Sequence, residues 1–210
     1  GHSNVQGDRT VGITEIPAKD FLDRLQAHYG FEPPREPGHN VVSALEAMVR
    51  GESRVFIALG GNFSVAIPDW DQTQEAMRKL NLTVHISTKL NRSHLIHGKD
   101  ALILPCLGRT ERDEQETGLQ AMTVEDSMSM VHATKGSFPP ASEHLRSEPA
   151  IVAGMARATL GEQSAVNWEY LIADYARIRD DIEAVFPIFQ AYNQRIKVPG
   201  GFHLPSAARE

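Results

Sequence analysis

Uninterrupted apolar runs along the chain predict a parallel β-sheet. Residues 55–59 (Val-Phe-Ile-Ala-Leu) contain no polar position, which is typical of a central strand that is buried on both faces. Residues 82–86 and 101–104 predict the next two strands. A helix that opens at Asp71 or Thr73 and ends near Leu80 separates the first two strands. This order favours parallel pairing with right-handed crossovers.

Other segments carry apolar residues at helical spacing, with recognisable start and stop signals. The predicted helices are 18–29, which stops at Gly30, 41–49, capped by Asn40, 148–160, which stops at Gly161, and a long helix from Asn167 to Phe186, ended by Pro187. Residues 122–131 alternate weakly and predict a short strand or one arm of a hairpin. Together these elements predict a three-layer α/β, Rossmann-like domain with a mainly parallel sheet flanked by helices.

Composition narrows the classes of partner. The 210 residues carry a formal net charge of −6, and no block of Lys or Arg offers a surface for nucleic-acid phosphates. No apolar run approaches the roughly 20 residues of a membrane span. The chain has one cysteine, which excludes an internal disulfide and fits a reducing compartment. We therefore expect neither a nucleic-acid nor a membrane partner, and a cytoplasmic location.

The Gly60-Gly61-Asn62 sequence directly follows the first predicted strand. Backbone N–H groups of a glycine turn can bind phosphate oxygens, and an asparagine side chain can contact a ribose or a base edge. The alternative is a plain turn. The spacing is not Gly-x-Gly-x-x-Gly, so the usual nicotinamide fingerprint is absent.

Polar residues elsewhere in the sequence indicate a binding or catalytic role less specifically than this turn does. Residues 87–89 (Ser-Thr-Lys) end the second strand and could bind a base, ribose or phosphate, or could simply be a polar strand end. The histidines His85, His94 and His97 lack a Cys or carboxylate to complete a zinc set, so we expect hydrogen-bonding roles at a surface or pocket. Cys106 is expected to be a small buried residue. The acidic residues Glu111, Asp113, Glu114 and Glu116 are expected to form a solvated loop face.

Several segments taken together resemble one family of enzymes. Residues 1–8 resemble the Gly-x-x-Asn-x-x-Gly segment of molybdopterin-dependent oxidoreductases of the dimethyl-sulfoxide-reductase superfamily, and residues 59–63 (Leu-Gly-Gly-Asn-Phe) resemble its Gly-x-Asn-Pro turn. Residues 82–94 resemble the strand and Thr-rich turn that follow. Residues 101–105 resemble its ADVVLP-like strand, and residues 123–127 resemble its TNTERR-like segment. The likeness is greatest to formate-dehydrogenase-like alpha subunits.

The chain also departs from that family's pattern. Phe63 stands where the family has proline, Ser87 where many members have aspartate, and Asp126 and Ser127 where it has two arginines. The family's iron–sulfur cysteines, its metal-ligating residue and its carboxyl-terminal barrel have no counterpart in the chain. The resemblance therefore implies one internal domain of a longer subunit, whereas the alternative is a tag remnant followed by a complete protein.

The resemblance implies a molybdopterin guanine dinucleotide carrying molybdenum or tungsten, with a 4Fe-4S cluster upstream of the chain. It places cofactor contacts near the start of the chain, at residues 4–7, and at residues 60–93. His2 is a possible pocket residue, and the chain is expected to contain no metal ligand. The implied cofactor-binding residues are Asn4, Gln6, Gly7, Gly60, Gly61, Asn62, Ser87, Thr88, Asn91 and Ser93. Residues 1–165 would form the cofactor-binding domain, and residues 166–210 a helical extension toward the barrel.

The implied function is that of a cofactor-binding domain in an oxidoreductase that acts on a small substrate, formate being the family's leading example. The chain alone is expected to be inactive. Its implied partners are the remaining domains of the same polypeptide and an electron-transfer partner. Two alternatives stay open: a stand-alone nucleotide-binding or regulatory module, and a scaffold domain that has lost its cofactor.

Overall fold

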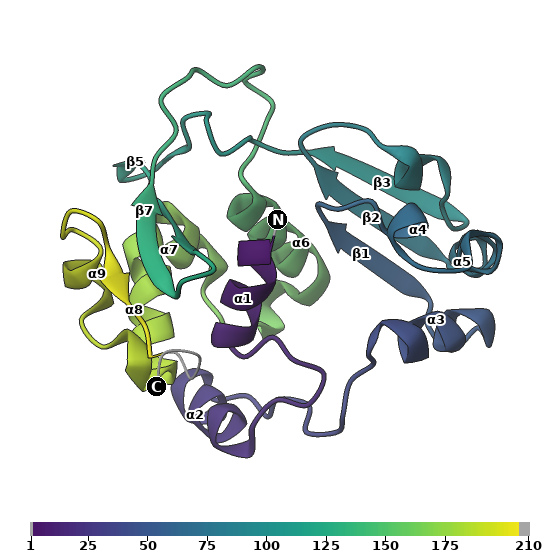
Figure 1. Cartoon of the computed structure of the whole chain (residues 1–210), viewed down its shortest axis with the longest axis horizontal. Helices are drawn as coiled ribbons and strands as arrows, with labels where there is room; N and C mark the ends of the chain where they lie inside the picture. The colour runs from purple at the N-terminus through teal and green to yellow at the C-terminus, as the bar shows by residue number, and fades with distance from the viewer. Residues whose placement is uncertain (1, 206–210) are drawn as a thin grey trace. The chain divides into compact units, whose positions relative to one another are not determined.

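The computed structural model describes residues 2–205, with side chains from Gln6 onward. The chain divides into two compact units, each of which is described by itself (Figure 1). Unit 1 comprises residues 1–38, 109–140 and 152–210, and unit 2 comprises residues 39–108 and 141–151. His2 and Asn4 lie in the first helix, and the side-chain roles predicted for them fall outside the described residues.

The described residues form a mixed α/β structure. The helices are α1 (His2–Thr10), α2 (Lys19–Tyr29), α3 (Val41–Val49), α4 (Phe63–Ala66), α5 (Trp70–Arg78), α6 (Glu148–Leu160), α7 (Trp168–Ala173), α8 (Tyr175–Val185) and α9 (Tyr192–Arg195), with short 3₁₀ turns η1 (Arg92–Leu95), η2 (Gly161–Gln163) and η3 (Pro187–Phe189). The strands are β1 (Val55–Leu59), β2 (Leu82–Ser87), β3 (Asp100–Pro105), β4 (Glu114–Gln115), β5 (Gly118–Leu119), β6 (Met122–Glu125), β7 (Met130–Thr134) and β8 (Phe202–His203).

Unit 2 contains the predicted parallel sheet. Its strand order is β1-β2-β3, and both pairs are parallel. The register places Ile57 opposite Val84 and Val84 opposite Leu102, so these three side chains share one face. Because parallel strands point the same way, the turns that follow β1 and β2 meet at one edge of the sheet.

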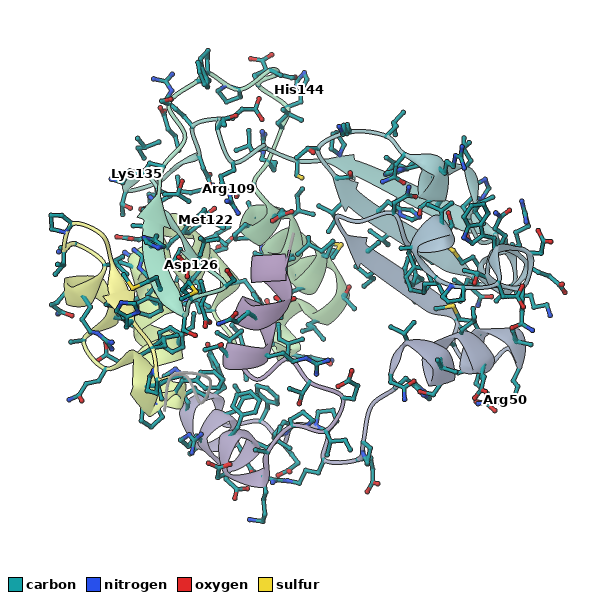
Figure 2. All side chains as sticks on the ribbon, viewed as in Figure 1. Arg50, Arg109, Met122, Asp126, Lys135 and His144 are labelled. Atoms are coloured by element: carbon teal, nitrogen blue, oxygen red, sulfur yellow. The ribbon has the colours of Figure 1, made fainter. Side chains whose placement is uncertain are left out.

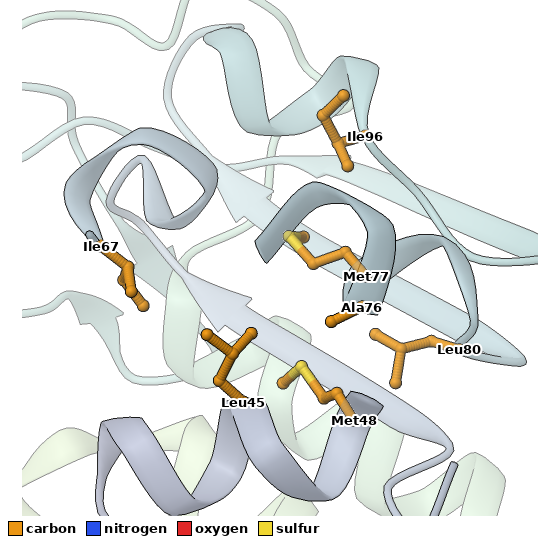
Figure 3. Packing of buried hydrophobic residues seen from close by; sticks show 7 residues of the cluster. All are labelled: Leu45, Met48, Ile67, Ala76, Met77, Leu80 and Ile96. Carbon is orange, nitrogen blue, oxygen red and sulfur yellow. The ribbon is translucent and has the colours of Figure 1, made fainter. Parts of the chain in front are cut away.

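The core of unit 2 covers only one face of this sheet. A buried cluster, shown in Figure 3, comes mainly from α3 and α5. Phe56 of β1 and Phe63 of α4 pack against it. Its members are Leu45, Met48, Ile67, Ala76, Met77, Leu80 and Ile96. Each is at most 9% exposed, so this cluster contributes the main apolar burial of the unit.

The prediction that residues 55–59 form a central strand with two buried faces is wrong for this chain. Within the described residues β1 pairs only with β2, which makes it an edge strand. Its side chains alternate between half-buried and exposed, and Val55, Ile57 and Leu59 are the exposed set. The strand bounds themselves are confirmed.

Unit 1 is built around a small antiparallel sheet. β6 and β7 form a hairpin, and β8 pairs with β7 on its other side. Its core is aromatic and aliphatic and joins the hairpin to the carboxyl-terminal part of the chain. The buried cluster comprises Val131, Phe189, Tyr192, Phe202 and Leu204. The strand or hairpin arm predicted at 122–131 is confirmed only over residues 122–125, because a four-residue turn follows and residue 130 begins the second arm.

The long helix predicted from Asn167 to Phe186 is in fact two helices. Asn167 caps α7 by accepting a hydrogen bond from the N–H of Tyr170 at 3.1 Å, as expected. Asp174 then leaves the helical region, with φ −151° and ψ 116°, and its carboxylate caps α8 through the N–H of Ala176. A side chain that offers the backbone an alternative hydrogen bond ends one helix and starts the next.

The prediction that the acidic residues at 111–116 form a solvated loop face is wrong for Asp113. This carboxylate is 8% exposed and accepts a hydrogen bond from the Tyr175 hydroxyl at 2.6 Å. It also accepts from the Gln115 side chain at 2.6 Å. Asp113 therefore stabilises the packing of α8 in unit 1, a role that its neighbours in sequence do not indicate.

Among the helices of residues 2–205, none is both long enough and apolar enough to cross a membrane.

Candidate functional site

The turn that follows β1 is the centre of the candidate site. Gly60 and Gly61 both have positive φ, at 71° and 76°, a conformation that residues with a Cβ rarely adopt. A Cβ built on either glycine would meet nothing within 4 Å. Backbone conformation, rather than crowding, therefore requires glycine here, and the space beside the turn is open to a ligand.

The loop after β2 is joined to this turn by an asparagine. The Asn91 amide donates from Nδ2 to the carbonyl oxygen of Gly61 at 2.7 Å. Its Oδ1 accepts from the N–H of Ser93 at 2.9 Å, so both ends of the amide are engaged. Asn91 thus fixes the carbonyl of the second glycine from a position 30 residues further along the chain.

Asn62 is held by a buried serine. Its Oδ1 lies 2.9 Å from Ser93 Oγ and accepts the N–H of Ser93 at 3.2 Å. Ser93 Oγ in turn accepts the N–H of Ser64 at 3.0 Å. Since Oδ1 is occupied, the Nδ2 group of Asn62 is the end of the amide that can donate to a ligand. Among the described residues it has no acceptor.

Two backbone donors accompany that amide. The N–H of Gly60 donates to the carbonyl of Ile86 at 2.7 Å, whereas the N–H groups of Gly61 and Asn62 have no acceptor among the described residues. Consecutive N–H groups of this kind bind anionic oxygens. The turn thus offers two backbone donors and one side-chain donor close together.

Two buried histidines lie beneath the loop after β2. His94 Nδ1 accepts the N–H of Asn91 at 2.9 Å, which completes a capping box around η1. His85 and His94 are 3% and 7% exposed, and their ring centroids are 4.9 Å apart. Nε2 of each is buried without a hydrogen-bond partner. Burial, with a smaller contribution from the neighbouring His94, lowers the pKa of His85.

Ser87 and Thr88 lie at the carboxyl end of β2. The Ser87 hydroxyl donates to the carbonyl of Lys89 at 2.8 Å, so it serves the turn itself. The Ser87 carbonyl accepts the N–H of Cys106 at 3.2 Å. Thr88 is exposed at this edge of the sheet and remains available to a ligand. Cys106 is buried, as the sequence predicts.

The amino-terminal candidates belong to unit 1. Gln6 Nε2 donates to Glu125 Oε1 at 2.9 Å and to Ser129 Oγ at 2.8 Å. An ideal Cβ on Gly7 would lie 3.9 Å from Glu125 Cβ. Glu125 is 9% exposed, and its Oε2 is buried without a partner. The structure thus brings together two segments that the family resemblance singles out separately, 1–8 and 123–127.

The segment in which the family has two arginines forms a tight turn in this chain. Asp126, which is labelled in Figure 2, accepts the N–H groups of Met128 and Met130 at 2.8 and 3.0 Å. It also contacts His132 Nε2 at 3.1 Å. These two N–H groups and His132 lower the pKa of Asp126. The hairpin between β6 and β7 therefore depends on this carboxylate.

Sequence reasoning missed the residues that hold the site together. Ser64 donates its N–H to Ser93 Oγ, which in turn contacts Asn62, and Glu125 accepts a hydrogen bond from Gln6. Each contact depends on a partner distant in the chain or on a bond to the backbone, and no local spacing indicates it. Among the residues that the structure describes, no group of three or more His, Cys, Asp or Glu side chains could hold a metal ion.

Comparisons with known proteins give relatives that are much longer than the chain. The chain is 57% identical to Protein YdeP of Escherichia coli (strain K12), over all of its 210 residues and 28% of that protein. It is 50% identical to Uncharacterized oxidoreductase Rv2900c of Mycobacterium tuberculosis (strain ATCC 25618 / H37Rv), again over its whole length and 27% of the relative. The chain thus spans little more than a quarter of these proteins. No protein-family model matches it.

Proposed function

We propose that this chain is the part of a longer oxidoreductase that holds a molybdopterin guanine dinucleotide for redox chemistry on a small substrate. The observation that carries the proposal is the open turn of Gly60, Gly61 and Asn62, fixed by Asn91 and Ser93. A relative that is 50% identical to the chain is named an oxidoreductase, which supports the reaction class. The resemblance of five segments to the superfamily supports the cofactor.

The site residues fit the nucleotide end of such a cofactor. Phosphate oxygens need clustered N–H donors and a close approach to the backbone, and the turn has both at Gly61 and Asn62. Asn62 Nδ2 adds a donor for a ribose or a base edge. In open α/β sheets, ligands bind beyond the carboxyl ends of the strands, which is where this turn lies.

We propose different roles for the residues that would bind the cofactor and for those that would position the turns. Gly61, Asn62 and Thr88 would contact the cofactor, since their donors or hydroxyl are available. Asn91, Ser93 and Ser87 would position the turns, since their polar side-chain atoms contact the protein. In unit 1, Gln6 and Gly7 would act toward the pterin end, with Glu125 orienting the Gln6 amide.

When bound, the cofactor would supply metal-centred redox chemistry through molybdenum or tungsten. The residues of this chain would bind and orient it. We further propose that the 4Fe-4S cluster, the metal ligand and the barrel belong to parts of the longer polypeptide outside this chain, and that electrons pass to a separate partner. The same proposal makes the sheet of unit 2 part of a three-layer, Rossmann-like domain.

A second candidate is a stand-alone nucleotide-binding module. The observation in its favour is that the turn, the Asn91 contact and the Ser93 contact all lie within unit 2. This alternative expects the 210-residue chain to bind a common nucleotide by itself. A flat calorimetric titration of the chain against NAD, FAD, ATP and GTP would exclude it.

The proposal is tested by Gly61→Val in a polypeptide of the relatives' length. Gly51→Val is the matched control, since Gly51 also has positive φ (74°) and open space around its ideal Cβ. Both variants carry the same backbone strain, of about 1–2 kcal/mol. We expect Gly61→Val to lose most of its guanine nucleotide, measured after denaturation, and Gly51→Val to retain it. Equal cofactor content in both variants would show that the turn is purely structural, as in a scaffold domain.

A further inference from the structure

The buried His94 ring is connected to the turn at Gly60 and Gly61 through one loop residue. Its Nδ1 accepts the N–H of Asn91 at 2.9 Å, and the Asn91 amide donates to the carbonyl oxygen of Gly61 at 2.7 Å. Asn91 is therefore held by the imidazole on one side and holds the second glycine on the other. All of these residues belong to unit 2, so the connection is complete within one unit.

The bond to Asn91 defines the protonation state of the His94 ring. A ring nitrogen accepts an N–H only when it carries no proton itself, so the ring is neutral in this arrangement, with its proton on Nε2. That Nε2 is buried and has no partner among the described residues. His94 is 7% exposed, and a charge in such surroundings is costly unless it is paired. The capping box of η1 thus requires a neutral imidazole.

Protonation of Nδ1 would reverse the direction of this hydrogen bond. Nδ1 also lies 3.2 Å from the carbonyl oxygen of Asn91 and 3.1 Å from its Oδ1, and a protonated ring could donate to either. The N–H of Asn91 would then lose its acceptor, and Oδ1 would be shared with the N–H of Ser93 that it already accepts. The two protonation states therefore favour two different arrangements of the residue that holds Gly61.

His85 is the titratable group that faces His94 from another element. The two ring centroids are 4.9 Å apart. Helix α4 packs against η1 and has no titratable side chain, while η1 and the loop before it add the positive side chains Arg92 and Lys89. Neither α4, β2 nor η1 carries a carboxylate that would offset a charge on His94. The neighbours thus disfavour protonation, and a proton that does bind finds no counter-charge on these elements.

We propose that neutral His94 is a positioning residue for the nucleotide-binding turn, and that protonation of its ring weakens nucleotide retention by loosening the hold of Asn91 on Gly61. The inference rests on the proposed function of the turn and adds to it the residue through which the turn responds to pH. His94 acts through Asn91 and does not itself contact the cofactor. The loss of one such hydrogen bond corresponds to about tenfold faster release of the nucleotide.

The release rate of guanine nucleotide from a polypeptide of the relatives' length tests the proposal. It is measured at about pH 7.5 and about pH 5, on either side of the ordinary histidine pKa. His94→Gln keeps a capping-box acceptor that does not titrate, whereas His94→Phe removes the acceptor. We expect the unsubstituted protein to release nucleotide about tenfold faster at the lower pH. We expect slow release at both pH values from His94→Gln and fast release at both from His94→Phe.

His97→Gln is the matched control, because His97 lies in the same loop and its Nδ1 contacts the carbonyl oxygen of Gly98 instead of Asn91. This variant is expected to respond to pH as the unsubstituted protein does. The same response in His94→Gln would overturn the proposal, as would a release rate from the unsubstituted protein that does not change with pH. Should His94→Phe fail to fold, the comparison of His94→Gln with His97→Gln still decides.

Backbone amide exchange of residues 88–95 separates this inference from the proposed function. A polypeptide without guanine nucleotide would count against the proposed function, whereas exchange needs no nucleotide. Rates are taken relative to the intrinsic rate of each sequence. At about pH 5 we expect the segment to exchange about tenfold faster in the unsubstituted protein than in His94→Gln, and at about pH 7.5 equally fast. Equal rates at both pH values would overturn the inference, whether or not nucleotide is bound.

Discussion

His85 carries an imidazole in an environment that disfavours its charged form. The ring is buried beneath the candidate site, its Nε2 has no partner, and the His94 ring lies 4.9 Å away, centroid to centroid. Burial, followed by the nearby His94, lowers the pKa of His85 in the folded state. Protonation of this residue therefore favours the unfolded chain.

The lowered pKa predicts how stability depends on pH. Below about pH 6.5 the unfolded state binds a proton at His85 that the folded state does not, so stability is present above that pH and is lost as the pH falls. The slope from one such group is at most about 1.4 kcal/mol per pH unit. We expect His85→Phe to reduce the slope between pH 7 and pH 5, and the exposed His144→Phe to leave it unchanged. Urea unfolding across this range measures both.

An unchanged slope in His85→Phe would show that His85 does not determine the pH dependence.

At the scale of single residues, sequence correctly singled out Gly60 and Gly61, because two glycines after a strand predict a left-handed turn. The buried position of His94 could not be predicted, since the polar segment around it indicates solvent exposure.

At the scale of elements, one hydroxyl joins α4 to η1. Ser93 Oγ contacts both Asn62 Oδ1 and the N–H of Ser64, and both serines are at most 1% exposed. Ser93→Ala would leave a buried N–H without its acceptor. Such a loss costs about 1–3 kcal/mol. We expect a free energy of unfolding lower by this amount, together with weaker retention of guanine nucleotide in the longer polypeptide.

Ser53→Ala is the control for this substitution. Ser53 lies in the same unit, is partly exposed, and makes no side-chain hydrogen bond with the described residues. Its replacement is expected to change the free energy of unfolding by less than about 0.5 kcal/mol. A Ser93→Ala variant as stable as Ser53→Ala would show that the Ser93 contacts do not hold the two elements together.

Local signals predicted several elements closely, because caps and glycine stops act within one turn. The bounds of β1 and α6 are confirmed, and Asn40 and Asn167 cap the helices expected of them. The break at Asp174 was missed because the apolar positions continue in helical register through it. The hydrogen bond between Asn91 and Gly61 joins residues that are 30 positions apart, so no local sequence pattern predicts it.

At the scale of the whole molecule, the sequence predicted the three parallel strands but not which faces they bury. An unbroken apolar run is typical of a strand with two buried faces, but it does not identify the segments that would pack on either face. In this chain one face of β1 stays exposed, and the relatives are more than three times as long as the aligned segment. The predicted boundary at residue 165 separates a cofactor-binding domain from an extension toward a barrel outside the chain. It stays a prediction.

The central claim is that this chain holds the nucleotide of a molybdopterin guanine dinucleotide. The most direct measurement is the guanine nucleotide and the molybdenum or tungsten released when an active polypeptide of the relatives' length is denatured. We predict that nucleotide and metal are released together, in amounts comparable with the protein. An active preparation that contains neither pterin nor metal would contradict the account.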